Sequence, residues 1–125
     1  MQLLLDTHTL IWWLANNSTL SNKAKDVIAD PNNIIYVSAA SAWEIAIKKS
    51  LGKLQAPDDL AMQIKAKGFI PLFIDIPHAL TVESLPWHHQ DPFDRILIAQ
   101  AIYEHLTIVT RDRKFSVYEV DIIKC

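Results

Sequence analysis

The stretch Leu3-Leu4-Leu5-Asp6 decides the fold, because it places an uninterrupted apolar run directly before a carboxylate. A short apolar run of this kind is typical of a strand buried on both faces, as in a parallel sheet. Asp6 then stands where the strand ends and a helix begins, as a candidate helix N-cap. Similar runs recur along the chain: Ile34-Ile35-Tyr36-Val37 precedes Glu44, and Leu106-Thr107-Ile108-Val109-Thr110 precedes Asp112.

Strand-like and helix-like segments alternate through the rest of the sequence. Strands are predicted at residues 2–6, 34–38, 71–75, 106–110 and 118–123. Helices are predicted at residues 7–15, 21–29, 40–51, 58–67, 77–84 and 93–105. Because hairpin signals are few, this alternation predicts an α/β fold of three α/β/α layers, in which helices cover both faces of a mainly parallel sheet.

The composition is that of one domain spanning residues 1–125 with a substantial hydrophobic core. Half of the residues are hydrophobic, and the only cysteine is Cys125, so no disulfide framework is expected. No basic leader and no membrane-spanning apolar stretch is present, which makes a reducing, cytoplasmic setting the expectation. The net charge of −2 is unlike that of a typical nucleic-acid binder. Several bases flank the acids, however, so a polyanionic substrate is not excluded.

Four carboxylates are predicted to meet at one edge of the sheet. Asp6 and Asp112 follow strands, Glu44 lies in about the first turn of the helix after the second strand, and Asp94 opens the helix before the fourth. In a parallel α/β sheet these positions share the edge where ligands bind. Clustered carboxylates repel one another unless a cation lies between them, and oxygen donors without cysteine suit Mg²⁺ or Mn²⁺.

Each acid also has a purely structural interpretation, which stays open at this point. Asp6 can cap a helix, Asp112 can belong to a turn, and Asp91 and Asp94 have the spacing of a capping box. Glu44 can form a solvated pair with Lys48, four residues along the same helix.

Several neighbouring side chains are weaker candidates. Lys48, Arg95 and Arg111 are candidates for contacts with phosphate groups, and the hydroxyls of Ser41 and Thr110 are candidates for supporting the metal site. The adjacent histidines His88 and His89 are interpreted as surface residues rather than ligands. Trp12 and Trp13 lie on different sides of one predicted helix, so they are not both expected to fit into one core. A tryptophan exposed at this position would indicate a protein interface.

With these residues identified, the chain resembles PIN-domain proteins, specifically the VapC-type toxins of toxin–antitoxin pairs. The resemblance extends over essentially the whole length and its central block is the most specific. It rests on Leu4-Leu5-Asp6-Thr7-His8, Ser38-Ala39-Ala40-Ser41-Ala42-Trp43-Glu44-Ile45, His89-Gln90-Asp91-Pro92-Phe93-Asp94-Arg95, Ala99-Gln100-Ala101 and Thr110-Arg111-Asp112.

The resemblance implies a five-stranded parallel sheet and a Mg²⁺- or Mn²⁺-dependent endoribonuclease. It also implies a homodimer that a cognate antitoxin holds inactive. Carried over to this sequence, the catalytic and metal-binding acids of the family fall on Asp6, Glu44, Asp94 and Asp112. Asp91, Thr7, Ser41 and Thr110 are the accessory candidates.

The mechanism expected from these residues is hydrolysis of a phosphodiester by water. Asp6 and Asp94 are expected to contact one or two metal ions directly, while Glu44 and Asp112 complete the shell, bind a second ion or orient water. Attack by water leaves a 5′-phosphate and a 3′-hydroxyl, because the ribose 2′-oxygen is not the nucleophile.

Three other classes compete with this interpretation. A phosphoacceptor receiver domain has the same kind of sheet, but it needs an acidic pair after the first strand, where Thr7 follows Asp6. A haloacid-dehalogenase-like phosphatase needs a second aspartate two residues after Asp6, where His8 stands. A PIN-fold binding module without catalytic activity stays open, although the complete acidic set argues against it.

Overall fold

The computed structural model describes residues 1–125 and contains one sheet flanked by helices. The five strands are β1 (Gln2–Leu5), β2 (Ile34–Ser38), β3 (Ile70–Leu72), β4 (Thr107–Thr110) and β5 (Ile122–Lys124). The α-helices are α1 (Thr7–Leu14), α2 (Asn22–Ala29), α3 (Ala39–Ser50), α4 (Leu60–Ala66), α5 (Ile76–Thr81) and α6 (Pro92–Glu104). Two short 3₁₀ helices, η1 (Val82–Ser84) and η2 (Arg113–Val117), complete the chain.

All neighbouring strands are parallel, in the order β3-β2-β1-β4-β5. The predicted fold class is therefore confirmed. The order also removes the receiver-like alternative, because that fold has the order β2-β1-β3-β4-β5. Since β2 lies on one side of β1 and β4 on the other, the chain changes direction across the sheet between β1 and β4. Ligands bind at such a switch point in open α/β sheets.

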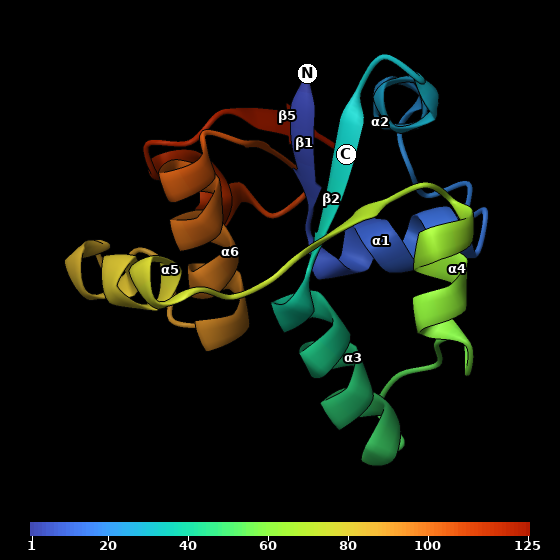
Figure 1. Cartoon of the computed structure of the whole chain (residues 1–125), viewed down its shortest axis with the longest axis horizontal. Helices are drawn as coiled ribbons and strands as arrows, with labels where there is room; N and C mark the ends of the chain where they lie inside the picture. Colours follow the sequence, from blue (N-terminus) through green and yellow to red (C-terminus); the bar gives the residue numbers. More distant parts are fainter.

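Two hydrophobic cores cover the two faces of the sheet. Leu3 and Leu5 point into the core formed with α1, α2 and α4, and Leu4 points into the core formed with α6. This alternation follows from the two-residue period of a strand, and it explains why all three leucines are fully buried. Figure 1 shows α2 and α4 on one side of the central strands and α5 and α6 on the other.

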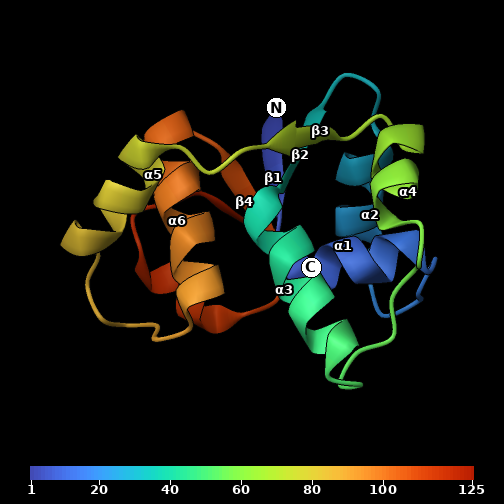
Figure 2. The ribbon, with the colours of Figure 1, turned by 60° about the horizontal axis from the view of Figure 1, so that its bottom comes forward.

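The carboxyl ends of the strands face the lower side of Figure 1, where α1 and α3 begin. Figure 2 turns this edge forward and shows α3 extending from it, between α1 and α6. A helix that follows a parallel strand starts at this edge, so α1 and α3 present their first turns there. This arrangement positions the candidate active site.

The sequence predicted some element boundaries incorrectly. β3 is shorter than predicted and lies at the edge of the sheet, the position where Pro71, which has no backbone N–H, is tolerated. The predicted helix at 77–84 is split into α5 and η1, and the last strand begins at Ile122 because η2 and a buried Tyr118 take up the preceding residues. None of the helices has the length and hydropathy that a membrane span requires.

Candidate active site

Asp6 lies between β1 and α1 and is 6% exposed. Its Oδ1 accepts a 2.8 Å hydrogen bond from the backbone N–H of Thr9, so it caps α1 as predicted. Its Oδ2 accepts a 2.5 Å hydrogen bond from the hydroxyl of Thr110, at the end of β4. Burial raises the pKa of Asp6, and the bonds from Thr110 and Thr9 partly oppose that rise. Capping and site formation are thus two roles of one carboxylate.

Glu44 is buried on α3, with 4% of its surface exposed, and lies in the second turn rather than the first. Its Oε1 accepts a 2.9 Å hydrogen bond from the hydroxyl of Thr7, which also lies 3.0 Å from the hydroxyl of Ser41. Its Oε2 pairs with Nζ of Lys48 at 2.5 Å. Glu44 raises the pKa of Lys48, and Asp91 and Asp94 add smaller effects in the same direction. The pair is therefore not the solvated surface pair that the spacing alone permits.

Asp94 lies in the first turn of α6, which Asp91 caps. The side chain of Asp91 accepts hydrogen bonds from the backbone N–H groups of Phe93 (2.8 Å) and Asp94 (3.1 Å). Burial raises the pKa of Asp94 to about 8, and the negative charges of the other acids add to the shift. Those acids are Asp91, Glu44, Asp6 and Asp112. The four predicted acids therefore form one electrostatic cluster.

Asp112 follows β4 and caps η2. Its Oδ1 accepts a 2.9 Å hydrogen bond from the backbone N–H of Lys114, and its own N–H donates to the hydroxyl of Thr110 at 3.1 Å. Thr110 therefore contacts both Asp6 and Asp112. It contacts the carboxylate of Asp6 and the backbone N–H of Asp112, and both acids line the same hollow.

His89, which the sequence analysis assigned to the surface, is part of the site. Its side chain is 7% exposed, and its Nε2 lies 2.8 Å from Oδ2 of Asp94 and 3.1 Å from Oδ2 of Asp112. One oxygen or nitrogen from each of these three residues falls within 4.8 Å of the others. His88 is exposed, as the sequence predicts, whereas His89 is buried. The sequence signal for His89 is its position two residues before Asp91, the acid that caps α6.

A hollow of about 290 Å³ opens beside the carboxylates and is lined by Asp6, His8, Trp12, Arg111 and Asp112. The guanidinium of Arg111 lies over the ring of Trp12, 4.6 Å from its centre, and its Nε donates to the carbonyl of Cys125 at 3.1 Å. Arg111 is itself exposed. A positive charge is thus fixed next to the acidic cluster.

Arg95 does not fit the phosphate contact that the sequence indicated for it. The residue is 3% exposed, and its guanidinium donates to four backbone carbonyls, those of Val82, Leu85, Pro86 and His89. Its guanidinium carbon also lies 3.8 Å from the ring centre of Trp87. Arg95 therefore fixes the loop before α6 from inside and has no free face for a ligand.

Trp12 and Trp13 do not provide the exposed surface that the sequence analysis considered. Both are partly buried against the same hydrophobic core, together with Leu14. Other large apolar side chains are exposed instead, among them Trp43 on α3 and Phe73 after β3.

Comparison with known proteins identifies the family. The chain matches the model of the PIN domain over residues 3–120. Ribonuclease VapC22 of Mycobacterium tuberculosis is 31% identical over 119 residues, which cover 89% of this chain and 87% of that protein. Ribonuclease VapC16 of the same organism is 41% identical over 61 residues, covering 46% of this chain and only 43% of that protein.

Solved structures agree on the fold. The crystal structure of VapBC2 from Rickettsia felis, bound to a DNA fragment from their promoter, aligns with a TM-score of 0.72 at 14% identity. The alignment covers 99% of this chain and 98% of that chain. The sequence match and the shared architecture point the same way: the chain belongs to the PIN-domain family, among the proteins named VapC.

Proposed function

We propose that this protein, a single PIN domain over residues 1–125, is a metal-dependent endoribonuclease that acts as the toxin of a toxin–antitoxin pair. The observation that carries the proposal is the cluster of Asp6, Glu44, Asp94 and Asp112 at the switch point of the sheet. Both relatives are named as ribonucleases, which supports the same activity.

The residues of the cluster fit a divalent cation. Burial and the charges of the neighbouring acids raise the pKa of Asp94 to about 8, which measures how unfavourable a further negative charge is at this point. A cation among the carboxylates removes that penalty. The donors are carboxylate oxygens, which Mg²⁺ and Mn²⁺ prefer. Asp6 and Asp94 would hold one ion directly, and Glu44 and Asp112 would complete its shell, bind a second ion or orient water.

The rest of the site keeps these oxygens in place. Thr9 and Thr110 orient Asp6, and Thr7 and Lys48 orient Glu44. When bound, the cation supplies Lewis-acid chemistry, lowering the pKa of water and polarising a phosphoryl oxygen. Hydrolysis by water leaves a 5′-phosphate and a 3′-hydroxyl on the RNA. Ends carrying a 2′,3′-cyclic phosphate would contradict this mechanism.

Arg111 and Lys48 are the proposed contacts with RNA phosphates. Arg111 lines the same hollow as Asp6 and Asp112, so its positive charge would lie near a phosphate group that enters this hollow. The side chain of Lys48 pairs with the buried Glu44 but is itself 40% exposed to solvent. Both positive charges lie beside the acidic cluster, which favours a polyanion at this otherwise acidic site.

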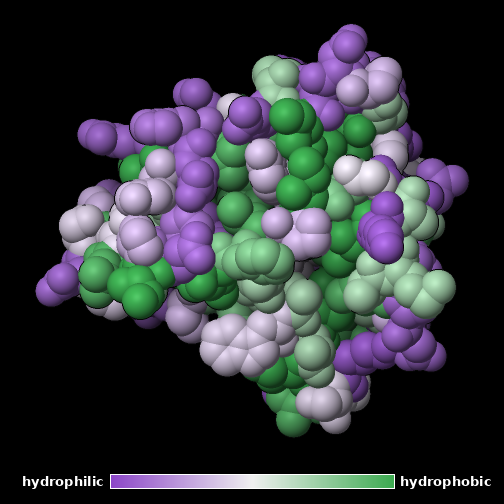
Figure 3. All heavy atoms as spheres, in the orientation of Figure 1, coloured by the Kyte–Doolittle hydropathy of each residue, from purple (hydrophilic) through white to green (hydrophobic).

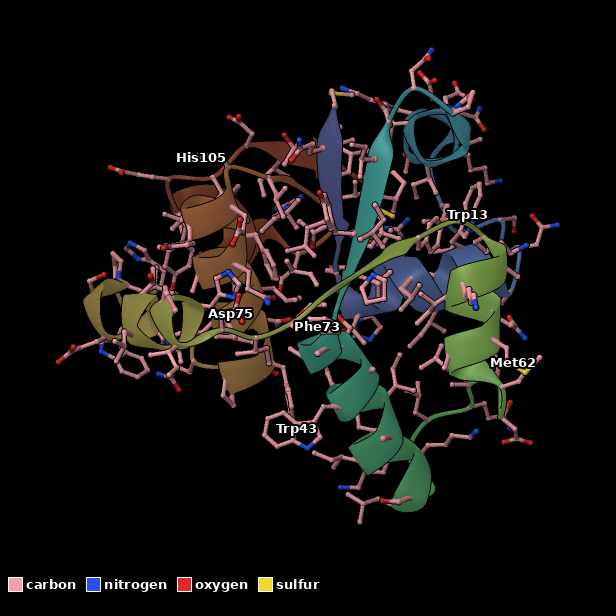
Figure 4. All side chains as sticks on the ribbon, in the orientation of Figure 1. Trp13, Trp43, Met62, Phe73, Asp75 and His105 are labelled. Carbon is pink, nitrogen blue, oxygen red and sulfur yellow. The ribbon has the colours of Figure 1, made fainter.

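A cognate antitoxin and a second copy of the chain are the proposed protein partners, and the cytoplasm is the proposed location. Figure 3 shows apolar side chains gathered in the middle of one face, with hydrophilic residues around them. Phe73 and Trp43 are 72% and 61% exposed, and Figure 4 places them on the β3–α5 connection and on α3. Exposed apolar side chains gathered on one face favour a protein partner.

The experiment that tests the function is cleavage of a panel of single-stranded RNAs by the purified protein. Reactions contain Mg²⁺, Mn²⁺ or excess EDTA, and Asp94→Asn purified identically is the control. Cleavage that requires the metal and is lost in the variant is the expected result. If well-folded, antitoxin-free protein binds Mn²⁺ yet cuts no RNA on a broad panel, the binding-module alternative gains.

A further inference from the structure

The ring of His89 lies between two carboxylates that belong to different elements. Its Nε2 is 2.8 Å from Oδ2 of Asp94, on α6, and 3.1 Å from Oδ2 of Asp112, after β4. The contact with Asp112 is a hydrogen bond, and the contact with Asp94 is a close ion-pair contact. His89 is therefore the link between the two acids, as Thr110 is the link between Asp6 and Asp112.

The second ring nitrogen determines which atom carries the proton. The backbone N–H of Asp91 points at Nδ1 of His89 at 3.3 Å, so Nδ1 accepts a hydrogen bond. In the neutral ring the proton is then on Nε2, which donates to Oδ2 of Asp112 and lies 2.8 Å from Oδ2 of Asp94. A ring that bound a cation through Nε2 would carry its proton on Nδ1, facing the N–H of Asp91, donor against donor. The geometry thus favours a donor to the acids over a direct metal ligand.

The surroundings of His89 hold it in this position. Its backbone N–H donates to the hydroxyl of Tyr118 at 2.9 Å, and its carbonyl accepts from Nη1 of Arg95 at 3.1 Å. Its ring packs edge-on against Phe115, with 5.7 Å between ring centres. The backbone and the ring of His89 are therefore both held in place, so Nε2 keeps its position relative to the two acids.

We infer that His89 is a positioning residue that holds Asp94 and Asp112 together, because its Nε2–H donates to Asp112 and the same nitrogen lies against Oδ2 of Asp94, so that one cation can use both side chains. This inference rests on the proposed function, because it assigns a role within the same metal site. Partners of this kind orient the ligands of metal sites, and their loss costs about 10–100-fold in metal affinity or activity.

The test compares His89→Leu, which removes the donor, with His89→Gln, whose amide keeps an N–H near the position of Nε2. Gln90→Ala, at an exposed neighbour in the same loop, is the matched control. Calorimetry with MnCl₂ alone gives the dissociation constant of each variant, after circular dichroism has established that each is folded. We expect about 10–100-fold weaker Mn²⁺ binding for His89→Leu, substantial recovery for His89→Gln and no change for Gln90→Ala.

Nitrogen-15 NMR of the histidine ring tests the hydrogen-bond assignment without any turnover. The expected spectrum of the wild-type protein has a protonated Nε2 and an unprotonated Nδ1, both without Mg²⁺ and after its addition. A proton on Nδ1, or unchanged Mn²⁺ affinity in a folded His89→Leu, overturns the inference while RNA cleavage by the wild type still upholds the nuclease. Wild-type protein that neither binds Mn²⁺ nor cuts RNA overturns both.

Discussion

Thr110 donates a 2.5 Å hydrogen bond to Oδ2 of Asp6, although the two residues are 104 positions apart in the sequence. The bond joins the ends of β1 and β4 at the switch point of the sheet. It also lowers the pKa of Asp6, against the larger effect of burial. A hydroxyl at the end of one strand therefore helps to keep the carboxylate at the end of its neighbour ionised, which is the form that binds a cation.

Replacing Thr110 by valine is expected to weaken binding of Mn²⁺ by about 10-fold or more, because Asp6 loses its orienting partner. The free energy of unfolding should fall by only about 1 kcal/mol, the contribution of one buried hydrogen bond. Calorimetry and urea unfolding measure the two effects. Thr107→Val, at the start of the same strand, is the control, and equal Mn²⁺ affinity in both variants would show that Thr110 has no part in the site.

Asp94→Asn is expected to reduce RNA cleavage by at least about 100-fold while the fold is kept, since a ligand should matter no less than the groups that orient it. Quantified cleavage at saturating Mg²⁺ measures the loss. Asp121→Asn, at an exposed acid away from the cluster, should cut like the wild type. Equal turnover would remove Asp94 from the site, and a large drop in melting temperature would favour a capping role instead.

The stability of the metal-free protein is expected to decrease as the pH rises from about 4 to about 8. Between its ordinary value of 3.8 and the raised pKa of about 8, Asp94 keeps a proton in the folded protein that the unfolded chain has released. The folded state thus binds more protons in this window, and the free energy of unfolding falls with pH.

The loss should be on the order of 2 kcal/mol, because solvent screens part of the effect at a side chain that is 21% exposed. Urea unfolding in EDTA at several pH values measures it. In Asp94→Asn the decrease should be much smaller, leaving mainly the contribution of Asp6. An unchanged slope in the variant would assign the effect to other groups.

Arg95→Met is expected to destabilise the fold by roughly 3–5 kcal/mol, because four backbone carbonyls lose their buried donor. Urea unfolding measures the change. Arg113→Met, at an exposed arginine, should lie within about 0.5 kcal/mol of the wild type. If Arg95→Met unfolded like the wild type but bound RNA less well, the phosphate contact indicated by the sequence would be correct after all.

Arg111→Gln is expected to weaken RNA binding and to reduce its salt dependence by about one phosphate contact. Fluorescence anisotropy with a labelled single-stranded RNA in EDTA, at several KCl concentrations, measures both without cleavage. Arg113→Gln is two residues away and does not line the hollow, so it is the matched control. Identical salt slopes in Arg111→Gln and the wild type would exclude a contact between Arg111 and phosphate.

The sequence predicts those features that depend on neighbouring residues. Leu3 to Leu5 form a buried strand because all three are apolar, and Asp6 caps α1 because it stands at the junction of strand and helix. The four acids could be assigned to one edge because parallel strands and the following helices share it. No residue-by-residue knowledge of packing is needed for these conclusions.

His89 and Arg95 could not be placed in the same way, because their environments come from distant parts of the chain. Tyr118, which fixes His89, is 29 residues away. The carbonyls bound by Arg95 belong to η1 and the loop after it, where the sequence has no hydrophobic periodicity. One local signal does exist for Arg95: residues 93–105 are apolar on nearly every side, which indicates a buried helix, and a charge within such a helix is buried as well.

The order of the strands determines when the candidate active site can form during synthesis of the chain. β1 and β2 can pair early, but Asp6 meets Thr110 only after β4 has been made, 104 residues later. A ribosome-bound chain that ends before β4 contains three of the four acids, Asp6, Glu44 and Asp94, but lacks Asp112 and the hydroxyl that orients Asp6. The four acids can therefore come together only after β4 and Asp112 have been made, long after β1, β2 and α3.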